Sequence, residues 1–442
     1  MKLYNTYTNT LEEFKPIKEK ELSIYVCGPT VYNYIHIGNA RPIIFFDVLR
    51  RYFEYKGYKV TYVSNFTDVD DKIIKEAKLE GITEKELTDK YIKAYLEDVK
   101  KLGSKTDYMK PRVTEYMPKI IDFIDRLVKC GAAYIVGGDV FFSVDSVKEY
   151  GALSNRNQED LMQGARIEIN DAKRNPNDFV LWKETKEGIQ FDSPWSKGRP
   201  GWHTECVTMI ESIFNSKIDI HGGGTDLIFP HHENEIAQSC ALNHHNIANY
   251  WVHNGRLNLA GEKMSKSLGN VILVKDLKMD PLAFRLLILS TYYRQMINFS
   301  DDLIDQYEKV YQRIRQAYNQ LFLILDVNDA FNRIETNDSK ALMDEFIMEL
   351  DNDINTPNAL TVLDKTVKLI NQKIRSKDNI NELLALFDAF SNMLEILGVK
   401  PNKERMSKEN KDLYNDWLKA REEKDFQKAD ELRVILSEKG VI

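Results

Sequence analysis

The front part of the chain alternates short apolar runs with one long amphipathic stretch. Glu21–Val26 and Lys59–Val63 are apolar runs typical of buried strands, and the spacing of apolar residues over Ala40–Tyr55 predicts a helix between them. The turn Cys27–Thr30, which contains a glycine, follows the first strand. A strand, a turn, a helix and a second strand form a βαβ unit, so we expect a parallel sheet that binds ligands at the carboxyl ends of its strands.

The pattern changes near residue 300. Long stretches in which apolar residues repeat every 3.6 positions fill the region that follows, among them Leu303–Leu325 and Ala341–Leu350. Only two glycines and two prolines occur there, so helices are seldom interrupted and a bundle is expected. A break at 399–402 separates a small last piece with two helical runs.

These patterns predict an α/β fold: a Rossmann-like parallel-sheet domain with an insertion, followed by a helical bundle and a small C-terminal module. The insertion is expected to contain a helix over Val113–Val128 and short strands around Tyr134 and Val140. The predicted boundaries are 1–104 and 201–300 for the parallel-sheet domain, 105–200 for the insertion, 301–398 for the bundle and 399–442 for the C-terminal module.

Composition is that of an ordinary soluble protein. The 442 residues are 43% hydrophobic and 29% charged, and no apolar run approaches the roughly 18–20 residues that a membrane span needs. The first residues carry no apolar stretch of the secretory type, so a cytoplasmic location without membrane contact is expected. The formal net charge of −7 gives no support to nucleic-acid binding, although basic patches can be local.

Cysteine and histidine are distributed in an informative way. Four cysteines in a chain of this size are too few and too scattered for a disulfide framework, so they are expected to be reduced. Seven of the eight histidines lie between His203 and His253, a window that also holds Cys206 and Cys240. Surface histidines in polar loops would explain this, but metal ligands or phosphate contacts are the preferred interpretation.

Two short segments suit phosphate chemistry. His36–Asn39 lies at the start of the first predicted helix, where backbone N–H groups favour anions and Gly38 permits close approach of a nucleotide. Lys263 and Lys266 lie in a glycine-flanked loop and can neutralise a triphosphate from two sides. Taken separately, an ordinary helix start is the preferred explanation of the first segment, and composition alone favours a solvated surface loop for the second.

Together, however, the two segments resemble the paired "HIGH" and "KMSKS" signatures of class I aminoacyl-tRNA synthetases, in the expected order. Further segments resemble one family of that class, the cysteinyl-tRNA synthetases, over essentially the whole chain; they are Cys27–Tyr32, Gly198–Cys206, His221–Asp226, Phe229–Ala237 and Trp417–Gly440. The resemblance implies activation of cysteine with ATP to cysteinyl-adenylate and pyrophosphate, and transfer of cysteine to the 3′ end of tRNA(Cys). It also implies a monomer whose last segment binds the anticodon.

The resemblance assigns the site residues as well. It places catalysis at His36, Asn39, Lys263 and Lys266. It places the amino acid at Cys27, Gly28, Thr30, Thr67, Trp202 and His221. It places ATP at His36, Gly38, Asn39, Gly222, Gly223, Gly224, Asp226 and Lys266, with Mg²⁺ expected beside the triphosphate. It places one zinc ion at Cys27, Cys206, His231 and Glu235.

The local sequence is compatible with this zinc site. Pro230 suits a first helical position, which sets His231 and Glu235 four residues apart on one helical face. Two thiolates, an imidazole and a carboxylate form a tetrahedral zinc set, and zinc would bind a cysteine thiolate in preference to the serine hydroxyl. His232 is expected to point away from the metal, and Cys130 and Cys240 are expected to be core thiols.

One departure and two alternatives remain. Asn39 stands where many relatives have a second histidine; it keeps a donor N–H₂ but cannot become cationic, so we expect nucleotide binding with less dependence on pH. A cysteine ligase acting on an amino sugar, of the mycothiol type, would share the adenylation site, but the long helical region argues against it. A non-catalytic RNA-binding paralogue is disfavoured because both lysines and all four zinc ligands are present.

Overall fold

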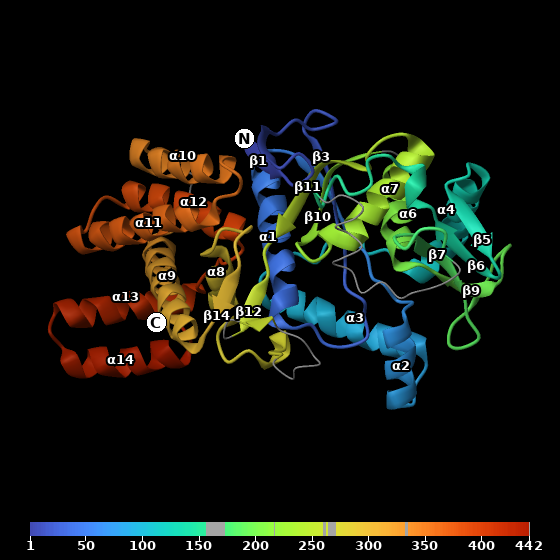
Figure 1. The fold of residues 1–442 in the computed structure, drawn as a ribbon. Helices are drawn as coiled ribbons and strands as arrows, with labels where there is room; N and C mark the ends of the chain where they lie inside the picture. Colours follow the sequence, from blue (N-terminus) through green and yellow to red (C-terminus); the bar gives the residue numbers. More distant parts are fainter. Residues whose placement is uncertain (156–172, 216, 260–261, 264–270, 332–334, 442) are drawn as a thin grey trace.

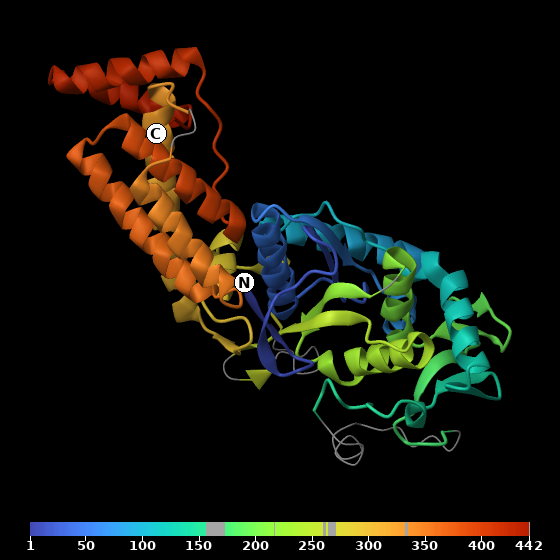
Figure 2. The same ribbon diagram turned by 90° about the horizontal axis from the view of Figure 1, so that it is seen from above.

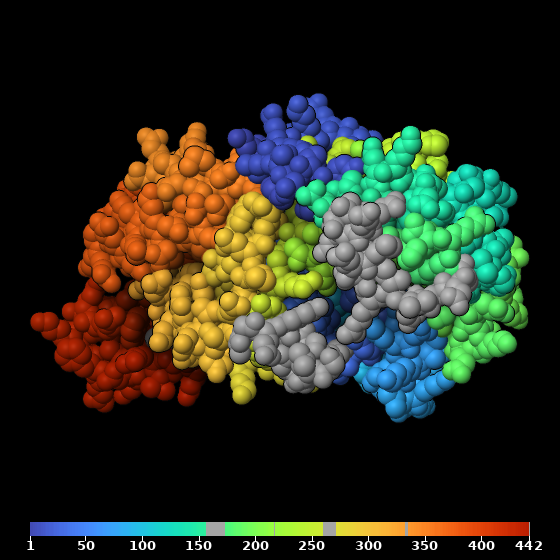
Figure 3. Space-filling view, in the orientation of Figure 1, coloured from blue at the N-terminus to red at the C-terminus, as the bar shows by residue number. Residues whose placement is uncertain are grey.

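The computed structural model describes residues 1–155, 173–215, 217–259, 262–263, 271–331 and 335–441. An α/β part and a helical part lie side by side, with residues 273–299 between them (Figures 1 and 3). The helical part extends away from the α/β part, and its last two helices lie farthest out (Figure 2). Among the described residues, no helix combines the length and apolar character that crossing a membrane requires.

The centre of the α/β part is a four-stranded sheet in which every pairing is parallel. Its order is β11–β10–β3–β4, formed by β11 (Ala248–Asn254), β10 (Ile218–Gly224), β3 (Glu21–Val26) and β4 (Lys59–Ser64). The predicted βαβ unit is confirmed. The chain continues from β3 to β4 on one side, while β10 pairs on the other side, so a crevice for ligands is expected between the ends of β3 and β10.

The helix of this unit, α1 (Ile37–Tyr55), begins earlier than its apolar pattern predicts. Its start is set by a capping box: the Gly38 amide donates to His36 Nδ1 at 3.1 Å, and the His36 amide donates to Asn39 Oδ1 at 3.1 Å. Two polar side chains of the first signature therefore fix the helix end beside the crevice.

The segment between β4 and the insertion stays close to the sheet. It contains α2 (Asp71–Glu80) and α3 (Glu84–Lys101), and then bridges to the end of β4 through the pairs Val63–Met109 and Phe66–Arg112. Residues up to 112 therefore lie along the edge of the parallel sheet, although the sequence pattern assigned those after 104 to the insertion.

The insertion is built on an antiparallel sheet of order β5–β6–β7–β9–β8. Its predicted helix is split into the 3₁₀ turn η1 (Val113–Tyr116) and α4 (Met117–Lys129), because Pro118 starts a new helix. The strands predicted near Tyr134 and Val140 are present. The five strands are β5 (Ala133–Val136), β6 (Asp139–Phe142), β7 (Phe179–Glu184), β8 (Phe191–Asp192) and β9 (Lys197–Pro200).

The chain returns to the central sheet through α6 (Trp202–Phe214) and β10, and then forms the irregular turn η3 (Ile228–His232) and α7 (Glu233–Asn243). After β11 it forms a second small sheet of order β13–β12–β14, with β12 (Leu257–Leu259), β13 (Glu262–Lys263) and β14 (Ile297–Phe299). This sheet and the neighbouring α8 (Pro281–Leu289) lie outside the parallel sheet, which the sequence pattern did not predict.

The predicted helical region is confirmed. It contains α9 (Asp301–Val327), α10 (Asn337–Asp351), α11 (Thr356–Ser376) and α12 (Ile380–Leu397), which pack on one another, and then the hairpin of α13 (Lys408–Glu422) and α14 (Phe426–Glu438). Apolar side chains such as Leu321, Phe346 and Phe390 form its core.

Arg285 joins the two parts of the molecule. Its guanidinium is fully buried and donates to Asp47 of α1 at 2.5 Å, to the Leu397 carbonyl of α12 at 2.6 Å, and to Ser104 Oγ and the Leu102 carbonyl at 2.8 and 3.1 Å. One cation thus connects α8, α1, the end of α3 and the end of the bundle.

A second connection lies at the N-terminal hairpin of β1 (Lys2–Asn5) and β2 (Thr10–Glu13), which we call the N-terminal clip. The Asp353 amide donates to the Lys2 carbonyl at 3.0 Å, and the Tyr4 amide donates to Asp353 Oδ1 at 2.7 Å. On its other side the clip donates from the Thr6 amide to the Trp251 carbonyl of β11 at 2.8 Å. The clip therefore touches both the parallel sheet and the α10–α11 turn.

Candidate functional site

Two cysteines meet at the crevice, although 179 positions separate them. Cys27 follows β3 at its carboxyl end, and Cys206 lies in the second turn of α6. Their Sγ atoms are 3.6 Å apart and Cys206 is buried. Thiolates bound to one zinc ion at about 2.3 Å in a tetrahedron would lie roughly 3.8 Å apart. The spacing of the two sulfurs therefore suits a shared metal.

His231 and Glu235 form the opposite wall. His231 Nε2 lies 3.0 Å from Glu235 Oε1, and both side chains are buried. Glu235 Oε1 is also 3.7 Å from Cys27 Sγ. One donor atom from each of Cys27, Cys206, His231 and Glu235 lies within 4.8 Å of all the others. The four residues that the resemblance assigned to zinc are therefore brought together.

The cluster separates charge in the absence of metal. The hydrogen bond from Cys27, supported by His231, lowers the pKa of Cys206 to about 6, whereas burial raises the pKa of Cys27 well above its usual range. Burial disfavours a charged His231, yet the charge of Glu235 raises the pKa of this imidazole to about 10. The thiolate of Cys206 and the carboxylate of Glu235 thus surround the positive charge on His231. A divalent metal can take the place of that positive charge.

His232 does not point away from the cluster as predicted. Its Nε2 lies 3.3 Å from Cys27 Sγ, and Cys27, His221, His232 and Glu235 form a second group of donors within 4.8 Å. The prediction was wrong because it assumed a regular α-helix. Residues 228–232 do not form one regular helix: the backbone is extended at Phe229 (φ −133°, ψ 132°), and α7 begins only at Glu233, so regular helical spacing does not set the directions of the two histidines.

Hydrogen bonding favours the first donor group. In the second group, His221 Nε2 lies 2.7 Å from Glu235 Oε2 and His232 Nδ1 lies 2.8 Å from His253 Nε2, so both rings are already held. His232 already has a partner at each ring nitrogen, while Nδ1 of His221 has no partner within the described part of the chain. The His231 ring is held by His203 at Nδ1, but its Nε2 is buried without a hydrogen bond of good geometry among the described residues. A metal would satisfy this nitrogen, and the chemistry of two thiols with one imidazole and one carboxylate fits zinc.

The remaining histidines support the donors. His203 Nδ1 lies 3.0 Å from His231 Nδ1, which leaves Nε2 of His231 directed to the cluster. His221 is fully buried behind Glu235, so any effect of His221 on the amino acid is transmitted through that carboxylate. Partners of this kind orient metal ligands and adjust their basicity.

The other residues expected to bind the amino acid surround this cluster. Trp202 stacks on His231 with 4.1 Å between ring centroids, and its side chain remains 41% exposed. Thr30 and Thr67 pair by a parallel bridge, and Thr67 Oγ1 donates to the buried Glu205 at 2.9 Å. Glu205, whose pKa burial raises well above its usual range, was missed by the sequence analysis although it lies inside the Gly198–Cys206 segment.

Close packing explains Gly28. A Cβ on Gly28 would lie 1.6 Å from the Asn65 carbonyl oxygen, and the Gly28 amide donates to Asn65 Oδ1 at 3.0 Å. Asn65 Oδ1 is also 3.7 Å from Cys206 Sγ. Asn65 therefore positions both the Cys27 turn and a thiol, a role that no sequence motif indicated.

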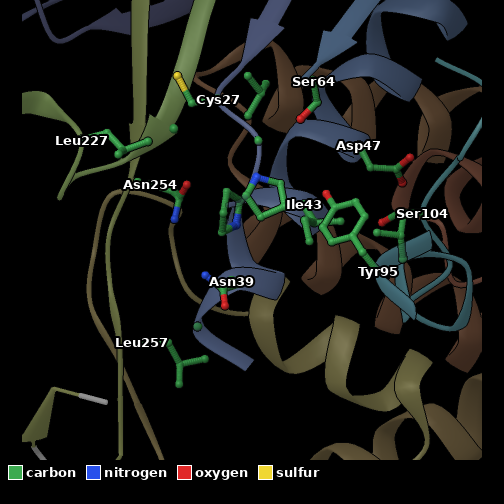
Figure 4. Close-up of a pocket in the computed structure, with 18 of the residues that line it drawn as sticks. Cys27, Asn39, Ile43, Asp47, Ser64, Tyr95, Ser104, Leu227, Asn254 and Leu257 are labelled. Carbon is green, nitrogen blue, oxygen red and sulfur yellow. The ribbon is translucent and has the colours of Figure 1, made fainter. Parts of the chain in front are cut away.

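A cavity of about 290 Å³ opens beside the cluster (Figure 4). It gathers many residues assigned to ATP and the amino acid, namely Cys27, Gly28, His36, Gly38, Asn39, Gly223, Gly224 and Asp226. Asn254, the last residue of β11, lines it too, as do Arg256 and Leu257. The position of these residues shortly before the second signature was the only available signal.

One assigned glycine lies elsewhere, and the structure does not describe the side chains of the two assigned lysines. Gly222 does not line the cavity, because it packs on α1, where a Cβ would meet the Phe46 ring at 2.1 Å. Its role is to let the sheet and α1 approach. Lys263 is described only as part of β13, and Lys266 lies outside the described residues.

Comparison with known proteins places these features in a family. A family model described as "tRNA synthetases class I (C) catalytic domain" matches residues 13–309, and one described as "DALR domain" matches residues 345–399. The cysteine–tRNA ligase of Acholeplasma laidlawii is 46% identical over 100% of both chains. That of Finegoldia magna is 47% identical over 100% of this chain and 97% of its own length.

Solved structures with the same fold are more distant in sequence. Methionyl-tRNA synthetase of Mycobacterium tuberculosis, in complex with methionyl-adenylate, has a TM-score of 0.61 and 14% identity, covering 86% of this chain and 90% of that one. The leucyl enzyme in an Agrobacterium radiobacter K84 complex with tRNA has a TM-score of 0.63 and 10% identity, covering 88% and 85%. These likenesses show the fold.

Proposed function

The chain belongs to the cysteine–tRNA ligases of class I, and from this premise we propose that it activates cysteine with ATP and transfers it to the 3′ end of tRNA(Cys). The observation that carries the proposal is the donor cluster of Cys27, Cys206, His231 and Glu235 beside the cavity at the ends of β3 and β10. A thiol-recognising site next to a nucleotide site is what formation of cysteinyl-adenylate requires.

Activation needs positioning more than acid–base chemistry. The carboxylate of cysteine is ionised at neutral pH and attacks the α-phosphate of ATP, and pyrophosphate leaves. The amino end of α1, His36, Lys263 and Lys266 would stabilise the charge that develops on the phosphates, with Mg²⁺ bound to the triphosphate. Because His36 uses Nδ1 in its helix cap, Nε2 is the nitrogen we assign to a phosphate.

Cys27, Cys206, His231 and Glu235 would hold the zinc ion. When bound, zinc supplies a soft acceptor for the thiolate of cysteine and a poor one for the hydroxyl of serine. Trp202 would cover the amino acid, and Thr67, held by Glu205, would contact it. Selectivity would then come from the binding step, without a separate editing site.

Zinc affinity is expected to rise with pH. Near pH 8 Cys206, with a pKa of about 6, is already a thiolate, whereas Cys27 and His231, with raised pKa values, still hold protons that zinc must displace. We expect about two protons to be released, a slope of log affinity against pH near +2 between pH 7 and 9, and a steeper slope below pH 6. Competition with a chelator at several pH values measures this, and a flat profile would mean that other residues bind the metal.

Asn39 leads to a prediction about ATP. An asparagine keeps its hydrogen bonds at every pH, whereas a histidine there would gain a positive charge below about pH 6.5. We expect the Asn39→His variant to show a steeper change in KM for ATP between pH 6 and 7.5 than the native chain, in pyrophosphate exchange. Equal profiles would show that position 39 does not contact phosphate.

The helical region is the proposed contact for tRNA. Residues 345–399 match the DALR domain, and the α13–α14 hairpin resembles an anticodon-binding segment. We infer that the chain acts as a monomer in the cytoplasm.

The deciding experiment is charging of unfractionated bacterial tRNA with labelled cysteine, and with labelled serine in parallel, in the presence of ATP and Mg²⁺. Acid-precipitable label from cysteine but not serine would support the proposal. Cysteine-dependent pyrophosphate exchange without charging would instead favour an amino-sugar ligase, and absence of both reactions would favour a non-catalytic paralogue. A preformed Ser-tRNA should remain intact with the enzyme, since rapid hydrolysis would reveal editing.

A further inference from the structure

The cavity at the crevice has a second part that none of the assigned residues explains. Figure 4 shows Asp47, Ser64, Tyr95 and Ser104 on one side of Ile43, and Leu227, Asn254 and Leu257 on the other. We call the first side the inner lobe; it is lined by Ile43, Asp47, Ser64, Tyr95, Val99 and Ser104. The lobe lies between α1, the end of β4 and α3, away from the glycines of β10.

Charged groups around the inner lobe are already paired. Asp47 accepts hydrogen bonds from Arg51 at 2.8 Å, from Arg285 at 2.5 Å and from the Lys105 amide at 2.8 Å. Arg50, which also lines the cavity, donates to Glu54 at 2.8 Å. An ionic ligand such as a phosphate would have to break these pairs, so the lobe suits an uncharged molecule.

The remaining walls are aromatic or apolar. Val99 and Tyr95 are buried, and the hydroxyl of Tyr95 donates to that of Tyr108. Tyr62 and Tyr108 meet edge to face, with 5.2 Å between their ring centroids. Aromatic rings prefer such edge and offset contacts, and phenol oxygens give a polar ligand edge a partner.

The lobe also borders a separate surface groove. Arg50, Tyr62 and Tyr108 line both the cavity and a groove that continues over Val60, Asp107 and Met109. These three side chains form the wall between the two spaces.

We propose that the inner lobe is a second binding site, for a neutral planar aromatic molecule with one hydroxyl or N–H group, which binds together with ATP and cysteine. The ring would lie against Val99 and Ile43, and the polar group would bond to the tyrosine hydroxyls or Ser64. Asp47 lines this site and also accepts a hydrogen bond from Arg285. A ligand bound in the inner lobe would therefore lie beside the joint between the sheet and the bundle. Binding at the inner lobe does not depend on the proposed reaction.

The test is a titration of the full chain with 4-methylphenol, with toluene as the matched apolar probe, followed by ligand-observed NMR. For a ligand of this size we expect a Kd of about 1 mM, weaker binding of toluene, and less than a twofold change when a non-hydrolysable ATP analogue and cysteine are saturating. Displacement of the phenol by the ATP analogue would overturn the proposal, because the probe would then occupy the nucleotide side. Failure of the native chain to bind 4-methylphenol would also overturn the proposal.

Two variants locate the site. Val99→Phe fills the lobe and should weaken phenol binding at least tenfold, while Ile92→Phe, a buried residue of the same helix that does not line the cavity, should not. Tyr95→Phe keeps the volume and should remove the preference for the phenol over toluene. Unchanged binding in Val99→Phe, or an unchanged preference in Tyr95→Phe, contradicts the proposal. If Val99→Phe does not fold, the Tyr95→Phe result and the ATP-analogue experiment decide.

Discussion

Replacement of Cys206 by alanine is expected to lower kcat/KM for cysteine activation by at least about a thousandfold, with loss of bound zinc. Even residues that only support a metal ligand cost about 10–100-fold when replaced, and Cys206 is itself a donor in the cluster. Removal of the Cys206 Sγ would leave the buried, charged side chains of His231 and Glu235 beside an incomplete set of metal donors. Zinc per chain by elemental analysis and cysteine-dependent pyrophosphate exchange measure the two effects.

Cys240→Ala is the matched control, because Cys240 is another free thiol, half-buried where Cys206 is buried, and belongs to neither donor group. It should keep its zinc and its activity. Full zinc occupancy in Cys206→Ala would contradict the assigned site.

The same measurement distinguishes the two donor groups. His231→Ala should lose zinc, whereas His232→Ala should retain it, since His231 Nε2 is buried without a hydrogen bond to any described residue and both ring nitrogens of His232 have partners. The reverse result would mean that the metal binds to Cys27, His221, His232 and Glu235.

Replacement of Arg285 by methionine is expected to destabilise the chain by about 3–5 kcal/mol, the usual cost of breaking a buried ion pair. Methionine keeps the aliphatic stem but leaves Asp47 and the carbonyls of Leu397 and Leu102 without this donor. A chain of two parts need not unfold in one step, so the first thermal transition should be followed. Arg313→Met, which breaks an exposed pair with Asp364, should cost no more than about 1 kcal/mol.

Acidification provides a second readout for this pair. Burial opposes ionisation of Asp47, but the charges of Arg285 and Arg51 lower its pKa below the ordinary value. A carboxylate with a lowered pKa stabilises the fold above its ordinary pKa of about 3.9, and this contribution is lost as the pH falls below that. The native chain should therefore lose more stability than Arg285→Met between pH 5 and 3. Equal losses would show that the pair contributes little.

Local patterns predicted the elements that depend on neighbouring residues. The strands at 21–26 and 59–64 and the long helices after 300 follow from apolar periodicity, because one buried face repeats at a fixed spacing. The small sheet of β12, β13 and β14 was missed, since strands of two or three residues carry no measurable period.

The site depended on contacts that periodicity cannot describe. No spacing rule joins Cys27 to Cys206, and only the resemblance to a family put them in one cluster. His232 was predicted wrongly because the extended backbone at Phe229 interrupts the regular helix that the prediction assumed. Gly222 was assigned to ATP with its neighbours, yet the close contact with the Phe46 ring is what requires a glycine at this position.

The N-terminal clip has a consequence for how the protein is made. Tyr4 and Asp353, which the clip joins, are 349 positions apart along the chain. At about 5–20 residues per second, roughly 20–70 s of translation separate them, so β1 leaves the ribosome long before the α10–α11 turn exists. Once β11 has been made, about 100 residues before Asp353, the hairpin can cover the edge of that strand, but the joint to the bundle still cannot close. The first segment synthesised is therefore among the last to complete its native contacts.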